Sequence, residues 1–330
     1  MIVLGIETSC DETAGAICQN GQILASVLSS QSIHNIYGGV VPEVASREHE
    51  RLLNAIIDET LKQAKIKKTD IDVISVTHGP GLAGALLTGV SFAKGLGLGL
   101  EIPVIPINHL EAHIYANFMA DPSLQYPFVC LLVSGGHTQI WLIKKFGSYT
   151  LLGETRDDAA GEAFDKGARI LGLGYPGGPE IEKLGKEGDP RKIAFPKALM
   201  EKGSLEFSFS GLKTSLLYYM DSFSEKTDVS KPDVAASYQF AIVEILVEKM
   251  KRAIDKTGVK TCVIAGGVAA NLSLRSTLEK RLKGVKILLP DLKYCTDNAA
   301  MIAYLGELKS QNNKYEKLDF PIYPNLKLAK

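Results

Sequence analysis

Apolar and polar positions alternate along the chain in short blocks that predict strands, turns and helices. Ile2–Glu7 is an apolar run typical of a buried strand, and the polar loop Thr8–Thr13 follows it. Ala14–Gln19 and Gln22–Leu28 are predicted to be two further strands, because Asn20-Gly21 between them is a strong two-residue hairpin signal. The chain is therefore expected to begin with three consecutive strands.

The same order of elements returns in the second half of the chain. Phe128–Val133 is again an apolar run, followed by the glycine turn Ser134–His137 and by strand-like segments at Thr138–Lys144 and Tyr149–Gly153. This repetition of strand, tight turn and strand predicts a duplicated architecture.

A later strand in each half is predicted to lead into a helix through glycines. Val73–Thr77 precedes Gly79-Pro80-Gly81 and a helical run to about Gly95, and Thr261–Ala265 precedes Gly266-Gly267 and a helical run from about Ala269. These junctions expose backbone N–H groups that bind anions well, although ordinary βα loops have the same pattern.

Helical spacing of apolar residues at Arg47–Lys65 and at Asp233–Lys256 adds helices to these strands. A chain of 330 residues exceeds what one hydrophobic core usually supports. We therefore expect an α/β protein of two lobes with a central cleft, residues 1–126 and residues 127–330, in which the last helix is able to pack back on the first lobe.

Composition narrows the class of protein. The chain is 45% apolar and has 37 basic and 37 acidic residues, so no overall basic field indicates nucleic acid. Any such contact would need a local patch, for which Arg191, Lys192, Lys197 and Lys213 are candidates. Five cysteines without a CxxC pair argue against a disulfide framework and fit a reducing compartment.

Neither a signal peptide nor a membrane span is expected. The N-terminus has no basic region, and the longest uncharged apolar stretch, Gly79–Ala93, is short and rich in glycine. These observations predict a cytoplasmic protein that is not bound to a membrane.

His109 and His113 carry the clearest chemical signal. Residues four apart lie one above the other on a helix, so the two imidazoles can share one metal ion. A zinc protease would need HExxH, whereas here Glu111 lies about 200° around the helix from His109. That geometry argues against a protease and leaves two alternatives, a metal pair or two histidines satisfied by ordinary hydrogen bonds.

A third ligand is expected from elsewhere in the chain. Asp297 is the best candidate, but an aspartate at the start of a helix is usually a cap. Cys295 could also bind metal, although a buried thiol is the commoner case. Asp11 and Glu12 are expected to face the same cleft, either acting on a proton or a metal-bound water or lying solvated in a turn.

Several glycine loops together suggest a nucleotide site. Alone, each is no more than a hairpin or a βα loop. The loops are Ser134–His137, Tyr175–Glu180 with Asp165 on the helix before it, and Gly266–Asn271, where Asn271 offers both a donor and an acceptor.

Ordered motifs along the whole chain resemble one family, the tRNA threonylcarbamoyladenosine transferases (TsaD, formerly Gcp). The motifs that carry the resemblance are Gly5–Thr13, His109–His113, Val133–Thr138, Gly161–Lys166, Tyr175–Pro179, Phe207–Thr214, Gly266–Asn271 and Cys295–Ala299. The resemblance implies a duplicated actin/hexokinase-like (ASKHA) fold. It also implies transfer of a threonylcarbamoyl group from threonylcarbamoyl-adenylate to the exocyclic amine of the adenosine adjacent to the anticodon in tRNAs that read ANN codons, with release of AMP.

The resemblance further implies specific site residues and partners. His109, His113 and Asp297 would bind one divalent metal ion, Fe²⁺ or Zn²⁺. A fold-related subunit (TsaB-like) and a small ATPase (TsaE-like) would assist, and Asp11 or Glu12 is a candidate to accept the proton of the amine. The residues implied to bind the adenylate are Leu132, Val133, Ser134, Gly135, Gly136, Asp165, Gly178, Glu182 and Asn271.

Two rival functions remain to be weighed. A small-molecule kinase of the same fold would bind Mg²⁺ through oxygen ligands, which the histidine pair does not favour. A catalytically idle assembly subunit would have lost the metal site, which the complete set of His109, His113 and Asp297 argues against.

Overall fold

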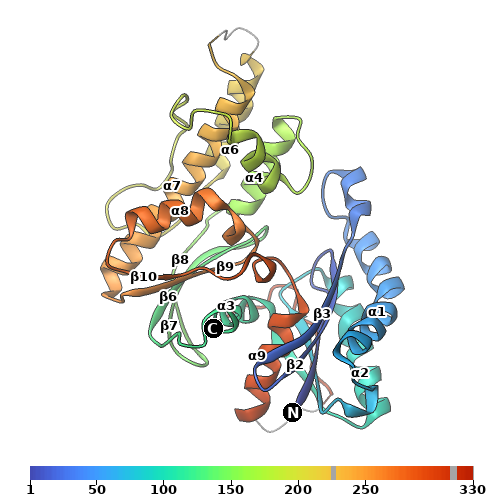
Figure 1. The fold of residues 1–330 in the computed structure, drawn as a ribbon. Helices are drawn as coiled ribbons and strands as arrows, with labels where there is room; N and C mark the ends of the chain where they lie inside the picture. Colours follow the sequence, from blue (N-terminus) through green and yellow to red (C-terminus); the bar gives the residue numbers. More distant parts are fainter. Residues whose placement is uncertain (224–227, 313–317, 330) are drawn as a thin grey trace. The chain divides into compact units, whose positions relative to one another are not determined.

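The computed structural model describes residues 1–223, 228–312 and 318–329, which form two compact units (Figure 1). The first unit joins Met1–Pro122 to Asp297–Lys330, and the second is Ser123–Thr296. The last helix, α9 (Ala299–Asn312), packs on strands β1, β2 and β4 of the first unit. The expected division into residues 1–126 and 127–330 allowed for this packing of the last helix.

The first unit is built on a five-stranded sheet in the order β3-β2-β1-β4-β5. The outer strands β3 and β2 are antiparallel, whereas β4 and β5 run parallel to β1. Asn20 and Gly21 join β2 to β3 with positive φ values of 52° and 75°, as a tight hairpin turn requires. The strands are β1 (Ile2–Glu7), β2 (Glu12–Gln19), β3 (Gln22–Ser30), β4 (Val73–Gly79) and β5 (Val104–Asn108).

Helices cover both faces of this sheet. Leu4 and Ile6 of β1 belong to a core with α1 (Pro42–Ala64) and α2 (Ala83–Leu100), and Gly5 between them faces α9. A Cβ at Gly5 would lie 2.5 Å from the Ala299 carbonyl oxygen, so a glycine here lets α9 lie directly on the strand. The remaining helix of the unit, α3 (His109–Ala120), packs against α9.

The second unit repeats this sheet, in the order β8-β7-β6-β9-β10. Two antiparallel strands, a central strand and two parallel strands follow one another as in the first unit, which confirms the predicted duplication. The strands are β6 (Phe128–Val133), β7 (Thr138–Lys145), β8 (Ser148–Glu154), β9 (Thr261–Ala265) and β10 (Lys286–Leu288).

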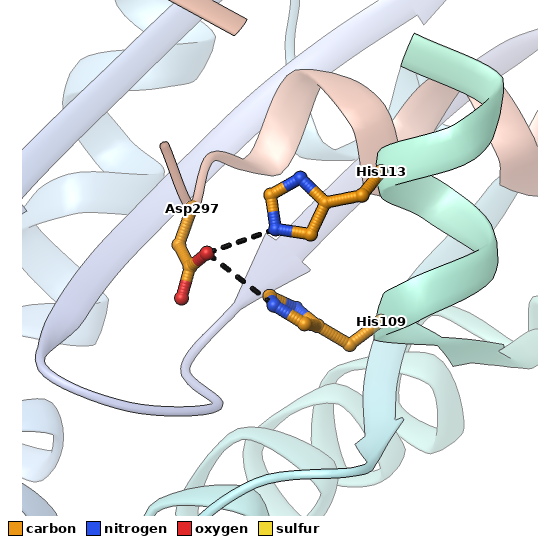
Figure 2. A group of neighbouring side chains, drawn as sticks. All are labelled: His109, His113 and Asp297. Atoms are coloured by element: carbon orange, nitrogen blue, oxygen red, sulfur yellow. Dashed lines mark hydrogen bonds and ion pairs between the residues drawn. The ribbon is translucent and has the colours of Figure 1, made fainter. Parts of the chain in front are cut away.

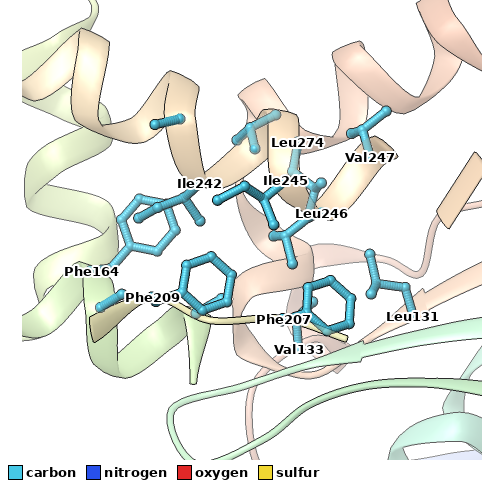
Figure 3. Packing of buried hydrophobic residues seen from close by; sticks show 14 of the residues in the cluster. Leu131, Val133, Phe164, Phe207, Phe209, Ile242, Ile245, Leu246, Val247 and Leu274 are labelled. Atoms are coloured by element: carbon cyan, nitrogen blue, oxygen red, sulfur yellow. The ribbon is translucent and has the colours of Figure 1, made fainter. Parts of the chain in front are cut away.

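Aromatic and aliphatic side chains fill the core of the second unit (Figure 3). Leu131 and Val133 of β6 pack with Phe207, with Phe209 and with the buried face of the long helix α7. The helices are α4 (Ala160–Ile170), α5 (Gly177–Gly185), α6 (Ser210–Asp221), α7 (Lys231–Thr257) and α8 (Leu272–Arg281).

Three helices differ from the predicted boundaries. Helix α1 begins at Pro42, five residues before the predicted start at Arg47. The helix after Gly267 starts at Leu272, not near Ala269, because a short 3-10 turn, Gly267–Ala270, comes first and Asn271 caps α8. Helix α2 runs past Lys94 to Leu100, which makes it long and apolar enough, by length and composition alone, to cross a membrane. One of its faces is buried in the core of the first unit, as in the core helix of a globular domain.

Candidate metal centre and adenylate loops

Helix α3 presents the two histidines one turn apart. The helix begins directly after β5, because the Asn108 side chain accepts hydrogen bonds from the N–H groups of Leu110 (2.9 Å) and Glu111 (3.2 Å). The imidazole centroids of His109 and His113 are 4.6 Å apart, with an angle of 86° between the rings. The helical placement predicted from their spacing is therefore confirmed.

Asp297 lies opposite both rings (Figure 2). Its Oδ1 atom is 3.3 Å from Nε2 of His109 and 3.0 Å from Nε2 of His113. The three donor atoms lie within 4.8 Å of one another. The structure thus brings together the three residues predicted as metal ligands.

The helix cap and the candidate ligand are two different residues. The Asn298 side chain accepts a 3.0 Å hydrogen bond from the Met301 N–H, which is the capping interaction of α9. The carboxylate of the preceding residue, Asp297, is directed at the imidazoles. These contacts therefore give the cap to Asn298 and place Asp297 with the histidines.

A second carboxylate lies behind His109. Oε2 of Glu7 is 3.0 Å from Nδ1 of His109 and accepts a 2.7 Å hydrogen bond from the Thr77 hydroxyl. The other oxygen of Glu7 accepts a 2.5 Å bond from the Ser9 N–H, and the Ser9 hydroxyl lies 3.2 Å from Nδ1 of His109. Glu7 is fully buried, so His109 is held from both sides by carboxylates.

The charges of the cluster depend on one another. Burial opposes a charge on His109, but Asp297 and Glu7 outweigh it and raise the pKa of that imidazole well above its ordinary value. Burial likewise opposes ionisation of Asp297, yet the two imidazoles hold the pKa of its carboxyl well below the usual range. Burial lowers the pKa of His113, which keeps this ring neutral as a metal ligand must be.

This donor set fits a divalent transition metal ion. Ligands of a tetrahedral ion bound at about 2.0–2.1 Å lie roughly 3.4 Å apart, close to the two distances from Asp297. A cation bound at Nε2 of His109 would leave the ring proton on Nδ1, which would donate it in a hydrogen bond to Glu7. The same arrangement fixes the tautomer of many metal-binding histidines. Two buried carboxylates require positive charge nearby, which a protonated His109 supplies without a metal ion and which a bound cation would supply on displacing the Nε2 proton.

Cys295 is not part of this group. Its thiol is buried, accepts a 3.1 Å hydrogen bond from Arg275 and lies near the carbonyl oxygens of Pro290 and Asp291. Burial raises the pKa of the Cys295 thiol, so the thiolate needed for metal binding is disfavoured. The commoner interpretation, a small buried thiol, is the one that the contacts support.

Asp11 and Glu12 lie at the junction of the first loop and β2. The Asp11 carbonyl accepts a 3.0 Å hydrogen bond from the Gln31 N–H, and His49 donates to the Cys10 carbonyl at 2.9 Å. Burial raises the pKa of the Glu12 carboxyl well above its usual range, with the charges of Asp297 and Asp11 acting in the same direction. The surroundings of the Glu12 carboxyl thus favour its protonated form more than those of a freely solvated turn residue would.

The predicted adenylate residues at the end of β6 lie in a tight turn. The Ser134 N–H donates a hydrogen bond to the His137 carbonyl at 2.8 Å, and the Ser134 carbonyl accepts one from the Gly161 N–H at 3.2 Å. A Cβ at Gly266, whose φ is +89°, would lie 2.3 Å from the Val133 oxygen, so the two glycine loops are in close contact. Leu132 and Val133 themselves are buried strand residues, and a Cβ on Gly135 or Gly136 would meet nothing within 4 Å.

The other predicted adenylate residues organise the same part of the second unit. Asp165 accepts a 2.7 Å hydrogen bond from the Gly177 N–H at the start of α5, next to Gly178. Glu182 of α5 accepts a 2.7 Å bond from the Leu272 N–H of α8. Asn271 caps α8 and donates to Gln239 at 2.7 Å. These contacts connect α4, α5, α7 and α8 around the glycine loops.

The four basic residues named as a possible patch are partly engaged in other contacts. Lys213 lies 3.6 Å from Asp158, Lys192 lies 3.8 Å from Asp228, and the Lys197 ammonium is 5.5 Å from the centre of the Phe240 ring. These contacts do not show whether the three lysines and Arg191 lie on one surface. A nucleic-acid patch therefore stays a prediction.

Sequence reasoning did not identify Glu7 or Lys309. Lys309 of α9 forms a 2.6 Å ion pair with Glu111, which explains where the glutamate between the two histidines is directed. Glu7 carries a usable signal, since it is a charged residue at the end of an otherwise apolar strand. Lys309 is an ordinary lysine near the end of a helix and carries none.

Comparisons with known sequences are consistent along the chain. The sequence model of the TsaD family, tRNA N6-adenosine threonylcarbamoyltransferase, matches residues 22–304. A tRNA N6-adenosine threonylcarbamoyltransferase of Thermosipho africanus is 52% identical over 99% of this chain and all of its own length. Proteins of the same name are 50% identical in Kosmotoga olearia, over 100% of this chain and 99% of theirs, and 54% identical in Thermosipho melanesiensis, over 93% and 94%.

Solved structures at low sequence identity show the fold. Component A of the (R)-2-hydroxyglutaryl-CoA dehydratase of Acidaminococcus fermentans aligns with a TM-score of 0.57 and 18% identity, over 94% of this chain and 100% of its own. HypF of T. kodakarensis aligns with a TM-score of 0.62 and 14% identity, over 94% of this chain and 48% of its own. The fold is the duplicated α/β fold of the actin/hexokinase class. On the strength of the sequence matches, the chain belongs to the tRNA N6-adenosine threonylcarbamoyltransferase family and is a transferase.

Proposed function

We propose that this protein transfers a threonylcarbamoyl group from threonylcarbamoyl-adenylate to the exocyclic amine of the adenosine adjacent to the anticodon, in tRNAs that read ANN codons. In this reaction the amine nitrogen forms a bond to the carbamoyl carbon. The bond between that carbon and the phosphate oxygen breaks, AMP leaves with the electron pair, and the amine loses one proton. The observation that carries the proposal is the His109, His113 and Asp297 cluster in a chain that matches this family across residues 22–304.

His109, His113 and Asp297 would hold one divalent ion, Fe²⁺ or Zn²⁺, whose Lewis acidity when bound would polarise the carbonyl under attack. Glu7 would keep the Nδ1 proton of His109 in place, so that Nε2 presents its lone pair. Three protein ligands leave positions for a substrate, unlike a closed structural site. This is the arrangement expected of a centre that orients a reactant.

The glycine loops of the second unit would bind the AMP part of the donor. Leu132, Val133, Ser134, Gly135 and Gly136 would contribute backbone at the end of β6, where added side chains on the two glycines would meet open space. Gly178 would also contribute, together with Asp165, Glu182 and Asn271, whose hydrogen bonds fix the loops around them. Backbone N–H groups that are already fixed in place need no free energy of reorganisation when charge develops on the leaving phosphate.

Asp11 or Glu12 would accept the proton that leaves the amine. An aryl amine is a weak base, so its proton becomes acidic only after the new bond has begun to form. Glu12 is the stronger candidate, because its carboxyl has a raised pKa and its loop is fixed through Gln31 and His49. A carboxylate with a raised pKa is a better proton acceptor than an ordinary one.

The partners follow from the same reaction. The substrate is a tRNA, the donor is the adenylate, and we propose that a fold-related TsaB-like subunit and a small TsaE-like ATPase support turnover. We also propose that the protein works in the cytoplasm. Its own composition provides no overall positive charge, so tRNA binding would depend on local basic residues or on a partner.

A reconstituted assay tests the proposal. Purified protein, tRNA, threonine, bicarbonate, ATP and the expected partners should yield the modified nucleoside, as detected by mass spectrometry of digested tRNA. Chelator or His109→Ala should lower the rate at least about 100-fold. Asp255→Asn changes an exposed carboxylate paired with Lys251 and should leave the rate unchanged. Full modification by His109→Ala would contradict the role of the metal centre.

A further inference from the structure

The two halves of the metal centre come from distant parts of the sequence. His109 and His113 lie on α3, whereas Asp297 directly precedes the Asn298 cap of α9. The distance between donors is therefore set by how α9 lies against α3. A shift of one helix along the other by a single residue would move a donor about 1.5 Å, a large fraction of a metal–ligand bond.

One ion pair connects these two helices. Oε2 of Glu111 and Nζ of Lys309 are 2.6 Å apart, with side-chain exposures of 8% and 21%. By comparison, the Arg47–Glu43 pair on α1 is 77% exposed on both sides and 3.2 Å long. A pair shielded from water is screened less by salt and is more sensitive to its geometry than a surface pair.

Glu111 lies on the same helix as both histidines. It lies between them in the sequence, on the first turns of a helix in which every residue from His109 to Asn117 is buried. Lys309 lies on the third turn of α9, a helix already fixed to the sheet by Gly5 under Ala299 and by the Ser75 hydroxyl bond to the Ile302 carbonyl, 3.0 Å long. The sheet fixes α9 on one side, and Glu111 fixes α3 to it on the other.

We propose that Glu111 and Lys309 form a positioning pair that sets the register of α3 against α9 and so holds Asp297 in range of the two imidazoles. Neither residue contacts the substrate or the metal ion in this role. The inference rests on the proposed metal centre. It assigns to the glutamate of the HLEAH segment a function in building the site, in place of the proton transfer that a protease would require.

Cobalt binding tests this role without relying on activity. Co²⁺ reports both its affinity, through competition with a chromophoric chelator, and its ligand geometry, through its visible absorption. Lys309→Met and Glu111→Gln should each weaken Co²⁺ binding by about 10-fold, the lower end of the loss seen when groups that orient ligands are removed, and should alter the spectrum. Lys309→Arg, which keeps the charge, should restore both.

A matched control separates positioning from general stability. Arg281→Met removes a helix–helix ion pair with Glu244 and Glu248 in the second unit, whose side chains are 34%, 22% and 23% exposed and thus partly shielded from water. It should lower the urea midpoint as Lys309→Met does and leave the Co²⁺ dissociation constant unchanged. If Lys309→Met alone does not fold, the double variant Glu111→Gln/Lys309→Met removes both charges of the pair and can be measured in its place.

The outcomes distinguish this inference from the function on which it rests. Co²⁺ binding by Lys309→Met within twofold of the wild type, with an unchanged spectrum, would overturn the positioning role and leave the metal centre intact. No Co²⁺ binding by the wild type, or equal binding by His109→Ala, would overturn the metal centre itself and the positioning role with it.

Discussion

Nδ1 of His109 lies 3.0 Å from a carboxylate oxygen of Glu7, a residue 102 positions earlier in the chain. This contact decides which nitrogen of the ring faces Asp297. Because Glu7 is buried and is itself held by Thr77 and by the Ser9 N–H, the ring has little freedom to turn. The orientation of one candidate ligand is thus determined at the end of strand β1.

Removing this carboxylate should weaken metal binding. Glu7→Leu deletes both the charge and the hydrogen bond and should raise the Zn²⁺ dissociation constant by about 10- to 100-fold. Glu7→Gln keeps an oxygen that can accept a hydrogen bond from Nδ1–H of His109, so it should raise the dissociation constant less. Competition with a chromophoric chelator measures both. Equal affinity of Glu7→Leu and Glu244→Gln, a half-buried glutamate of the second unit, would count against this role for Glu7.

Asp297 and Asn298 offer a pair of neighbouring substitutions with opposite expected effects. Asp297→Asn should abolish stoichiometric metal binding, as measured by elemental analysis after dialysis, and should leave the cap of α9 in place. Asn298→Ala should cost about 1 kcal/mol in urea unfolding through loss of the cap, with metal content unchanged. Loss of metal from Asn298→Ala and retention by Asp297→Asn would reverse the assignment.

Substitutions at two adjacent glycines should distinguish the effect of backbone strain on stability from the effect of a lost ligand contact on binding. Gly266→Ala forces a side chain into a position with φ of +89° and against the Val133 oxygen, and should destabilise the protein by about 1–3 kcal/mol. Gly267→Ala adds a methyl group that meets nothing within 4 Å, so the stability of the protein should be unchanged. If AMP approaches this loop, calorimetry should show about 10-fold weaker AMP binding by Gly267→Ala. Unchanged AMP affinity would show that AMP does not approach the loop at Gly267.

Acid stability should depend on the cap of α7. Hydrogen bonds from the Asp189 N–H (2.7 Å) and from the side chain and N–H of Ser230 hold the pKa of Asp233 at about 2, below its ordinary value of 3.8. A carboxyl with a lowered pKa in the folded state stabilises above its unfolded pKa, and this stability is lost as the pH falls from 3.8 through about 2.

The melting temperature is the measurement. Asp233→Asn should lower it at pH 5 and should give a shallower fall between pH 4 and 2 than the wild type shows. Asp255→Asn, an exposed carboxylate of the same helix, serves as the control and should follow the wild-type curve. Parallel curves for Asp233→Asn and the wild type would contradict this explanation.

Local patterns were enough to predict much of the sheet. The bounds of Ile2–Glu7, Phe128–Val133 and Thr261–Ala265 agree with the structure, because each is an apolar run ended by polar residues or glycine. The start of α8 was predicted too early, since Asn271 acts as a cap only after a 3-10 turn that no apolar periodicity reveals.

Long-range contacts set the limit of prediction for the site. The spacing of His109 and His113 predicts a shared face, because four residues make about one helical turn. Asp297 could not be separated from a cap until Asn298 was seen to accept the Met301 N–H. The partners Glu7 and Lys309 are 102 and 198 residues from His109 and Glu111, so only the folded chain brings them together.

The first unit is assembled from two segments of the chain that the whole second unit separates. Residues 1–122 leave the ribosome without α9, so the face of β1 at Gly5 stays uncovered until the last segment has been made. The second unit is continuous from Ser123 to Thr296 and can fold while translation goes on. Asp297 is the first residue of the returning segment, so the three donors can meet only after the whole of the second unit has been made.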